Sequence, residues 1–136
     1  MALFHEAVVI SQSIDLPAEV VYTFARQEEN LPRWASGLAQ GIEQRDGAWF
    51  AESPMGQVRI VMAPANVFGV LDHDVTLPNG VCVHNAFRVT PRGDGSLLTF
   101  VVLRLPGVSQ ANFDADVAHV QRDLAALKQL LEQQNV

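Results

Sequence analysis

The stretch IDLPAEVVYTFARQEENLPRWASGL, residues 14–38, contains two places where a helix can begin. At the first, Pro17 fits the first turn of a helix, and Glu19 suits the positive end of the helix dipole. At the second, Pro32 again fits a first turn, and Gly37 ends the segment a few residues later. The stretch therefore predicts two short helices in direct succession.

Patterns typical of strands lie on both sides of these helices. Residues 4–14 are rich in β-branched side chains that alternate imperfectly with polar ones, which predicts one strand. Residues 39–106 consist of short β-rich runs separated by turn sequences, which predicts six strands joined as an antiparallel meander. The turn sequences are Arg45-Asp46-Gly47, Ser53-Pro54-Met55-Gly56, Pro64-Ala65-Asn66, Leu77-Pro78-Asn79-Gly80 and Arg92-Gly93-Asp94-Gly95.

The C-terminal segment has the strongest helical pattern of the chain. Ser109 is able to cap a helix, and apolar residues follow it at spacings of three and four. These residues are Phe113, Val117, Val120, Leu124, Leu127 and Leu131. We therefore expect one long C-terminal helix with an apolar stripe.

The order of these elements predicts an α+β fold in a single domain that spans residues 1–136. One face of a seven-stranded sheet needs cover, and only the last helix has an apolar stripe long enough to provide it. A strongly curved antiparallel sheet wrapped around a single helix is not filled solidly by that helix. We therefore expect a cavity between sheet and helix, closed at one end by the two short helices.

Composition excludes several classes of partner. The formal net charge of −6 argues against nucleic acid, because phosphate binding needs a basic surface. No apolar run approaches the ~20 residues that cross a bilayer, and the basic residues are too scattered for a membrane-binding patch. Cys82 is the single cysteine, and no Cys/His spacing suggests a metal or cofactor site. The first residues lack the basic region of a signal peptide, so we expect a cytoplasmic protein. These patterns neither predict nor exclude an oligomer.

Four stretches carry a resemblance to known proteins: IDLPAEVVYTFARQEENLPRWASGL (14–38), FGVLDHDVTLPNG (68–80), FRVTPRGDGSLLTFVVLRLPG (87–107) and QRDLAALKQLLE (121–132). They resemble the SRPBCC (START-like) superfamily, and in particular a bacterial subgroup labelled polyketide cyclase/dehydrase. The resemblance implies the helix-grip fold, with a seven-stranded curved sheet around a long C-terminal helix and a buried apolar ligand pocket. It implies no single reaction, since members include enzymes, carriers and chaperone-binding domains.

The stretch LDHDVTLPNGVCVH, residues 71–84, raises the question whether its acids and histidines form a catalytic or metal-binding cluster. Neighbouring residues of a strand point to opposite faces, so Asp72 and Asp74 share one face and His73 takes the other. The three side chains therefore cannot converge. A zinc ion shared by His73 and His84 lacks an evident third ligand, so we predict no metal site.

The residues that share a face with His73 depend on the length of the next hairpin loop. A two- or four-residue loop puts His84 and Arg88 on the His73 face, whereas a three-residue loop aligns His73 with Asn85. A tight turn through the following glycine-rich loop then adds Phe100, Val102 and Arg104 to that face.

Two interpretations of the sheet interior stay open. If apolarity decides, Asp72 is the interior polar group among Phe68, Val70, Phe87 and Leu103. If the cavity is partly polar, the inward residues are His73, Arg88 and Arg104. Neutral His73 would then move a proton, and an arginine would stabilise an oxyanion. The resemblance to the cyclase subgroup includes both arginines and favours the second interpretation.

The candidate site residues follow from these arguments. The predicted catalytic residues are His73, Arg88 and Arg104. The predicted ligand-binding residues are Trp34, Asp72, His84, Phe100, Val102, Phe113 and Val117, whereas His119 is expected to be an ordinary surface or core histidine. The leading hypothesis is binding of a lipid-, aromatic- or polyketide-like hydrophobic molecule in the cavity. The alternatives are a cyclase or dehydratase and a protein-interaction domain that activates a chaperone ATPase.

Overall fold

The computed structural model describes residues 6–134 and confirms the predicted α+β fold. The first half contains β1 (Ala7–Ile14), α1 (Ala18–Ala25), η1 (Glu28–Asn30), α2 (Leu31–Trp34) and η2 (Ser36–Leu38), where η denotes a 3₁₀ turn. The meander comprises β2 (Ile42–Arg45), β3 (Ala48–Ser53), β4 (Gly56–Met62), β5 (His73–Thr76), β6 (Cys82–Arg92) and β7 (Gly95–Leu103). The chain continues into α3 (Gln110–Gln134). Residues 4 and 5 of the first predicted strand lie outside the described residues.

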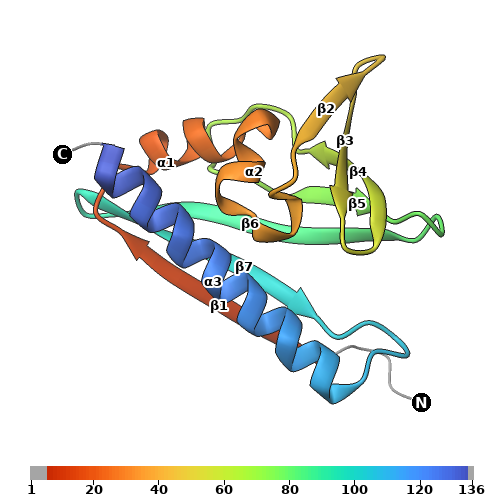
Figure 1. The fold of residues 1–136 in the computed structure, drawn as a ribbon. Helices are drawn as coiled ribbons and strands as arrows, with labels where there is room; N and C mark the ends of the chain where they lie inside the picture. The colour runs from red at the N-terminus through yellow and green to blue at the C-terminus, as the bar shows by residue number, and fades with distance from the viewer. Residues whose placement is uncertain (1–5, 135–136) are drawn as a thin grey trace.

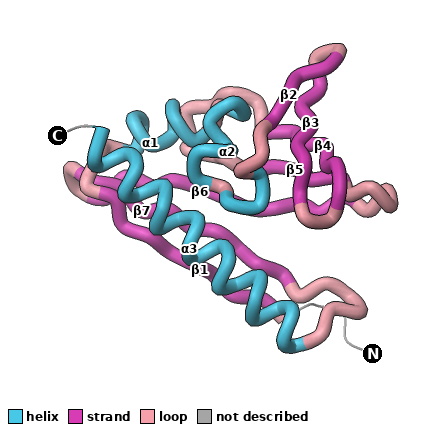
Figure 2. The backbone as a smooth tube through the Cα atoms, viewed as in Figure 1, coloured by secondary structure: helices cyan, strands magenta, loops and turns pink. Residues whose placement is uncertain are grey.

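The strands form one antiparallel sheet in the order β1-β7-β6-β5-β4-β3-β2. Successive strands pair as hairpins, and β1 joins the sheet beside β7. Helix α3 runs along β1 and β7, α2 lies beside α3, and α1 lies over β6 (Figure 1). Figure 2 shows the helices next to one another, while the β2–β3 hairpin projects away from the other strands.

The hydrophobic core lies between the inner face of the sheet and α3. The longest strands contribute buried side chains at alternate positions, namely Phe87, Val89, Leu98, Phe100 and Val102. Helix α3 contributes Phe113, Leu124, Leu127 and Leu131, which belong to the predicted apolar stripe. Burying one such side chain fully contributes about 1.5–3 kcal/mol, so this stripe is the main attachment of the helix. The predicted cap is confirmed, because Ser109 Oγ accepts a hydrogen bond from the Asn112 amide at 3.1 Å.

The loop between β5 and β6 has three residues. The Leu77 amide donates to the Val81 carbonyl at 2.8 Å, which leaves residues 78–80 in the loop. Gly80 has a φ of +88°, a conformation that glycine adopts without the steric cost of a Cβ atom. This loop length pairs His73 with Asn85, which is the alternative that the sequence left open.

The loop between β6 and β7 has two residues. Arg92 pairs with Gly95, so only residues 93 and 94 form the turn. The same register pairs Phe87 with Phe100, and both aromatic side chains point into the core. Residue 88 therefore points to the outer face of the sheet, away from Phe87.

The connection from β4 to β5, residues 63–72, is largely irregular. The Asn66 side chain organises it by accepting hydrogen bonds from the Phe68 and Val70 amides, both at 3.0 Å. Gly69 is required in this segment, because its φ is +73° and a Cβ atom would lie 2.2 Å from the Val89 carbonyl oxygen.

The apolar interpretation of the sheet interior is wrong for Phe68 and Leu103, because neither side chain is buried. Phe68 is 81% exposed at the tip of the irregular segment, and Leu103 is 42% exposed on β7. The same interpretation is correct for Phe87, which is buried. The partly polar interpretation fails for Arg88, because that side chain lies on the outer face.

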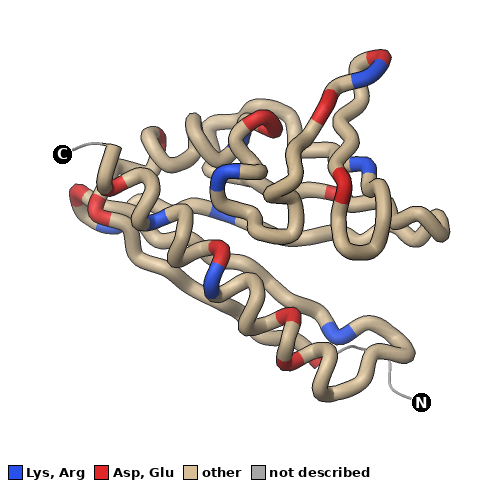
Figure 3. Tube along the Cα trace, viewed as in Figure 1, with Lys and Arg blue, Asp and Glu red and all other residues tan. Residues whose placement is uncertain are grey.

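Charged side chains are spread over the surface. Figure 3 shows the lysines and arginines distributed along the chain without a concentrated basic patch. Within residues 6–134, no helix combines the length and the apolar character that crossing a bilayer requires. Helix α3 is long, but apolar residues form only one side of it.

Candidate ligand pocket

A pocket of about 530 Å³ lies between α2, α3 and the inner face of the sheet. Its volume falls within the range of about 300–1,000 Å³ that is typical of small-molecule sites. Most lining side chains are apolar or aromatic, including Leu31, Trp34, Val58, Ile60, Val75, Phe100, Val120 and Leu124. The polar side chains of the lining are Ser53, His73, Asp116, His119, Arg122 and Asp123.

His73 lies at the sheet side of this pocket, at the start of β5. Its Nδ1 lies 3.0 Å from the Leu71 carbonyl oxygen. Because a carbonyl oxygen only accepts, Nδ1 carries the ring proton in this hydrogen bond. Burial lowers the pKa of His73 below its ordinary value, while the bond to Leu71 and the charge of Asp72 oppose that shift. The net direction favours the neutral ring.

Three aromatic side chains surround His73 and the adjoining core. The centroid of the His73 ring lies 6.2 Å from that of Phe87 and 6.0 Å from that of Phe100, both in edge arrangements. Trp34, from α2, packs on Phe87 at 5.9 Å. Trp34 and Phe100, two of the predicted ligand-binding residues, line the pocket. These edge contacts restrict the orientation of the His73 ring.

A polar cluster on α3 lies on the opposite side of the pocket from β5. His119 Nε2 lies 3.1 Å from Asp123 Oδ2, one helical turn away. Asp123 Oδ1 accepts hydrogen bonds from the hydroxyl of Ser36 at 2.8 Å and from its amide at 3.2 Å. Asp123 is only 9% exposed, so these bonds compensate its burial and join η2 to α3.

Sequence patterns do not predict this cluster, apart from the spacing of His119 and Asp123. A separation of four residues puts both on one face of a helix. Ser36 is distant in the sequence, and only the packing of η2 against α3 brings it to Asp123. His119, which was expected to be an ordinary surface or core histidine, is 43% exposed and also lines the pocket, so its role stays a prediction.

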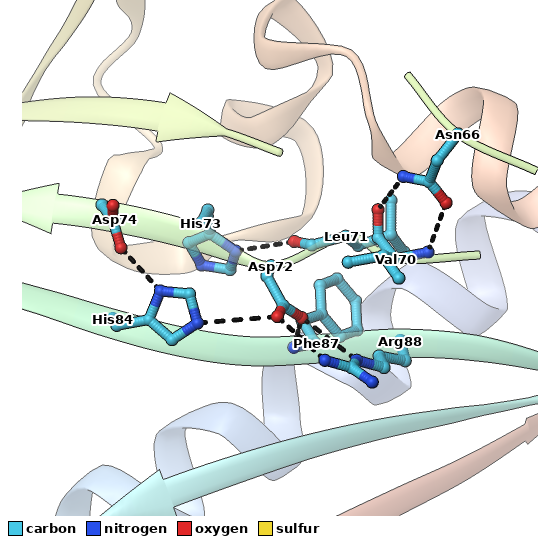
Figure 4. Close-up of polar contacts among 9 residues, drawn as sticks. All are labelled: Asn66, Val70, Leu71, Asp72, His73, Asp74, His84, Phe87 and Arg88. Atoms are coloured by element: carbon cyan, nitrogen blue, oxygen red, sulfur yellow. Dashed lines mark hydrogen bonds and ion pairs between the residues drawn. The ribbon is translucent and has the colours of Figure 1, made fainter. Parts of the chain in front are cut away.

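A second polar cluster lies on the outer face of the sheet (Figure 4). Asp72 bonds to Arg88 Nη2 at 3.1 Å and accepts from the Phe87 amide at 2.9 Å. His84 bridges the two acids, with Nδ1 2.7 Å from Asp74 Oδ1 and Nε2 3.5 Å from Asp72 Oδ2. The structure therefore selects the three-residue alternative for the β5–β6 loop, in which His84 and Arg88 lie on the opposite face from His73.

The outer cluster shifts the titration of its own members. Burial alone would raise the pKa of Asp72, but hydrogen bonds from Arg88 and Phe87 and the nearby positive charges lower it overall. The hydrogen bond to Asp74 raises the pKa of His84. These shifts have a structural explanation and require no ligand.

The remaining predicted site residues lie outside the pocket lining. Arg104 follows β7 and donates to the Val108 carbonyl at 2.9 Å and to Gln110 Oε1 at 2.9 Å, which ties down the loop before α3. Val102 and Phe113 are buried in the core, and Val117 is partly buried on α3. Hydrogen bonds of the described residues do not link Arg88 or Arg104 to His73, so a joint catalytic role stays a prediction.

A larger groove of about 620 Å³ lies between α1, the irregular segment and the β6–β7 turn. Its lining includes the exposed Phe68 and the acids Glu19 and Asp94, and it contains no histidine. The pocket under α3 is smaller, but it combines buried aromatic side chains with a few convergent polar groups. That combination is the usual character of a ligand site. No three His, Cys, Asp or Glu side chains within residues 6–134 are grouped to hold a metal ion.

Comparisons with known proteins identify the fold. No protein-family profile and no curated protein sequence matches the chain. XoxI from Bacillus cereus matches with a TM-score of 0.74 at 14% identity, over 96% of this chain and 98% of that protein. Ara h 8.0201 matches with a TM-score of 0.70 at 12% identity, over 94% and 98% of the two chains. A START superfamily protein from Mycobacterium smegmatis matches with a TM-score of 0.68 at 17% identity, over 94% and 98%. Similarity at these identities concerns the arrangement of the elements. The chain therefore has the helix-grip fold of the START-like (SRPBCC) proteins.

Proposed function

We propose that this protein binds a hydrophobic small molecule in the pocket between α2, α3 and the sheet. The observation that carries the proposal is the 530 Å³ pocket with its mainly apolar and aromatic lining. Moving an apolar ligand from water onto such surfaces gains about 25 cal/mol per Å² of area buried. The resemblance noted in the sequence implies an apolar pocket in the same place of the fold.

The test is a thermal-shift and calorimetry screen with hydrophobic aromatic, polyketide-like and lipid-like compounds. A ligand at 100 times its Kd should raise the free energy of unfolding by about 2.7 kcal/mol. Failure of every compound class to stabilise the protein would contradict the proposal.

A matched pair of variants locates the binding site. Val75→Trp introduces a large side chain where β5 lines the pocket, and should abolish the stabilisation by ligand. Val61→Trp makes the same change on the neighbouring β4, where the side chain is 48% exposed, and should leave binding intact. Melting of each unliganded variant shows whether it is folded. Binding that survives in Val75→Trp would place the ligand elsewhere.

A catalytic form of the proposal, a cyclase or dehydratase, is favoured by the position of His73 alone. A neutral imidazole beside an apolar pocket is able to accept a proton from a bound substrate. Arg88 is engaged with Asp72, and Arg104 with the loop before α3. If His73→Ala retains turnover of a polyketide-like substrate, His73 has no part in the chemistry.

A further inference from the structure

His73 has one ring nitrogen that the fold leaves unused. Its Nδ1–H donates to the Leu71 carbonyl, so in the neutral ring Nε2 carries a lone pair and acts as an acceptor. No hydrogen bond from a group within residues 6–134 reaches this Nε2. The buried side-chain atoms left without a partner in that range are Trp34 Nε1 and Ser96 Oγ. His73 Nε2 is not among these buried atoms without a partner, and His73 lines the pocket.

We infer that the ligand of this pocket presents a neutral hydroxyl group, as in a phenol, to Nε2 of His73. The inference deepens the proposed function and rests on it. A hydroxyl group is a donor, and Nε2 in this tautomer is able only to accept. Because the Leu71 carbonyl fixes the tautomer before any ligand arrives, the site is preorganised for a donor.

The side chains around His73 favour a ligand whose hydroxyl group is attached to an aromatic ring. Phe100 contacts the imidazole and lines the pocket from β7, and Trp34 lines the pocket from α2. An aromatic ring placed between these side chains gains edge or offset contacts in addition to apolar burial. The hydroxyl of a phenol lies in the plane of its ring and projects from its edge, so a ring packed against these side chains is able to direct it toward an acceptor in the lining.

The charges of the pocket disfavour an anionic ligand. A carboxylate would need a positively charged His73, and the burial of that ring favours its neutral form. Asp116 and Asp123 contribute negative charge to the lining. Arg122 is the cation of the lining, but it lies on an exposed part of α3 rather than beside His73. The pocket therefore selects a neutral donor over a negatively charged acceptor.

Three naphthalene derivatives test the inference by calorimetry near neutral pH: 2-naphthol, 2-methoxynaphthalene and 2-naphthoate. The first is a neutral donor, the second has the same ring without a donor, and the third is an anion. We expect 2-naphthol to bind about fivefold more tightly than 2-methoxynaphthalene, the ratio that one neutral hydrogen bond typically gives. We expect 2-naphthoate to bind more weakly than either.

Two variants with the same chemical change assign the preference to His73. His73→Phe keeps a flat ring but removes the acceptor, and should bind 2-naphthol and 2-methoxynaphthalene equally. His84→Phe makes this change on the outer face, where the histidine contacts Asp74, and should retain the preference. Nitrogen NMR of the unmodified protein gives a second readout that needs no variant. Nε2 of His73 should be unprotonated in the free protein and should shift when 2-naphthol is added.

The outcomes separate the inference from the proposed function. Equal affinity of the unmodified protein for 2-naphthol and 2-methoxynaphthalene would overturn the inference and leave the proposed function intact. A protonated Nε2 in the free protein, or tighter binding of 2-naphthoate, would also overturn it. If none of the three compounds binds and the wider screen also fails, the proposed function falls and the inference falls with it.

Discussion

Replacing Asp72 by alanine should destabilise the fold although the residue lies outside the pocket. Its carboxylate accepts a hydrogen bond from the Phe87 amide at 2.9 Å, and its side chain is only 14% exposed. Losing a hydrogen bond to a charged acceptor, and leaving a partly buried amide unpaired, costs about 1.5–3 kcal/mol. The ion pair with Arg88 adds about 0–1 kcal/mol, because the arginine side chain is 55% exposed. We expect Asp72→Ala to lower the free energy of unfolding by about 1.5–4 kcal/mol.

Urea denaturation near neutral pH measures this loss, and two further variants resolve its origin. Asp72→Asn keeps an oxygen that is able to accept from the Phe87 amide but removes the charge, so it should cost only about 1 kcal/mol. Asp74→Ala removes a carboxylate that is 46% exposed, so it should cost about 0.5 kcal/mol or less.

The pH dependence provides an independent check on Asp72. Its folded-state pKa lies below its ordinary value, so its charge stabilises the fold above the unfolded-state pKa. That contribution is lost as the pH falls through the folded-state pKa. The stability gap between the unmodified protein and Asp72→Asn should therefore shrink in acid. A gap that stays constant in acid, or a loss below about 0.5 kcal/mol for Asp72→Ala, would refute the reasoning.

Three further changes test other parts of the structure. Leu127→Ala should lower the free energy of unfolding by about 2–5 kcal/mol, because this side chain of α3 is fully buried; a loss under about 1 kcal/mol would contradict tight packing of the helix on the sheet. Gly69→Ala should cost more than Gly47→Ala in the same urea assay, since both have positive φ but only the first would place a Cβ against backbone; equal costs would argue against the close approach of the Val89 carbonyl. His84→Ala should matter more in mild acid than in mild base, because the raised folded-state pKa of His84 gives a contribution that is complete below its unfolded-state pKa and lost as the pH rises through the folded one. Urea titrations at both pH values that give the same difference would contradict that assignment.

The elements of the fold were predictable because their patterns are local. The prolines of residues 14–38 and the Ser109 cap act within a few residues of where they stand. Turn sequences separate the strands of the meander, and the apolar stripe of α3 recurs at helical spacing. The main departure is residues 63–72, where side-chain bonds of Asn66 replace regular pairing.

The sheet face that lines the pocket was harder to predict, because it depends on two hairpin loops. The loop after β5 has three residues instead of the two or four that would align His73 with Arg88. The loop after β6 has two residues, whereas a turn through residues 93–95 was expected. For β7 the two differences compensate, so Phe100 does lie on the His73 side. Only the first difference affects β6, and it moves Arg88 to the outer face.

The Asp123 cluster could not be predicted from the sequence for a different reason. Its hydrogen bonds to Ser36 connect η2 with α3, and no local pattern records that these segments meet. Polar contacts between distant segments depend on the final packing, which hydrophobic periodicity specifies only for the apolar faces.

The β2 edge of the open sheet is poorly suited to association with other chains. Strand β2 forms one edge and has only four residues, of which Glu43, Gln44 and Arg45 are exposed. Glu43 and Arg45 also form an ion pair at 3.2 Å. A short strand with charged side chains is a poor template for an incoming strand, because pairing would desolvate its charges for few backbone hydrogen bonds. The β2 edge is therefore protected against aggregation by the addition of strands from other molecules.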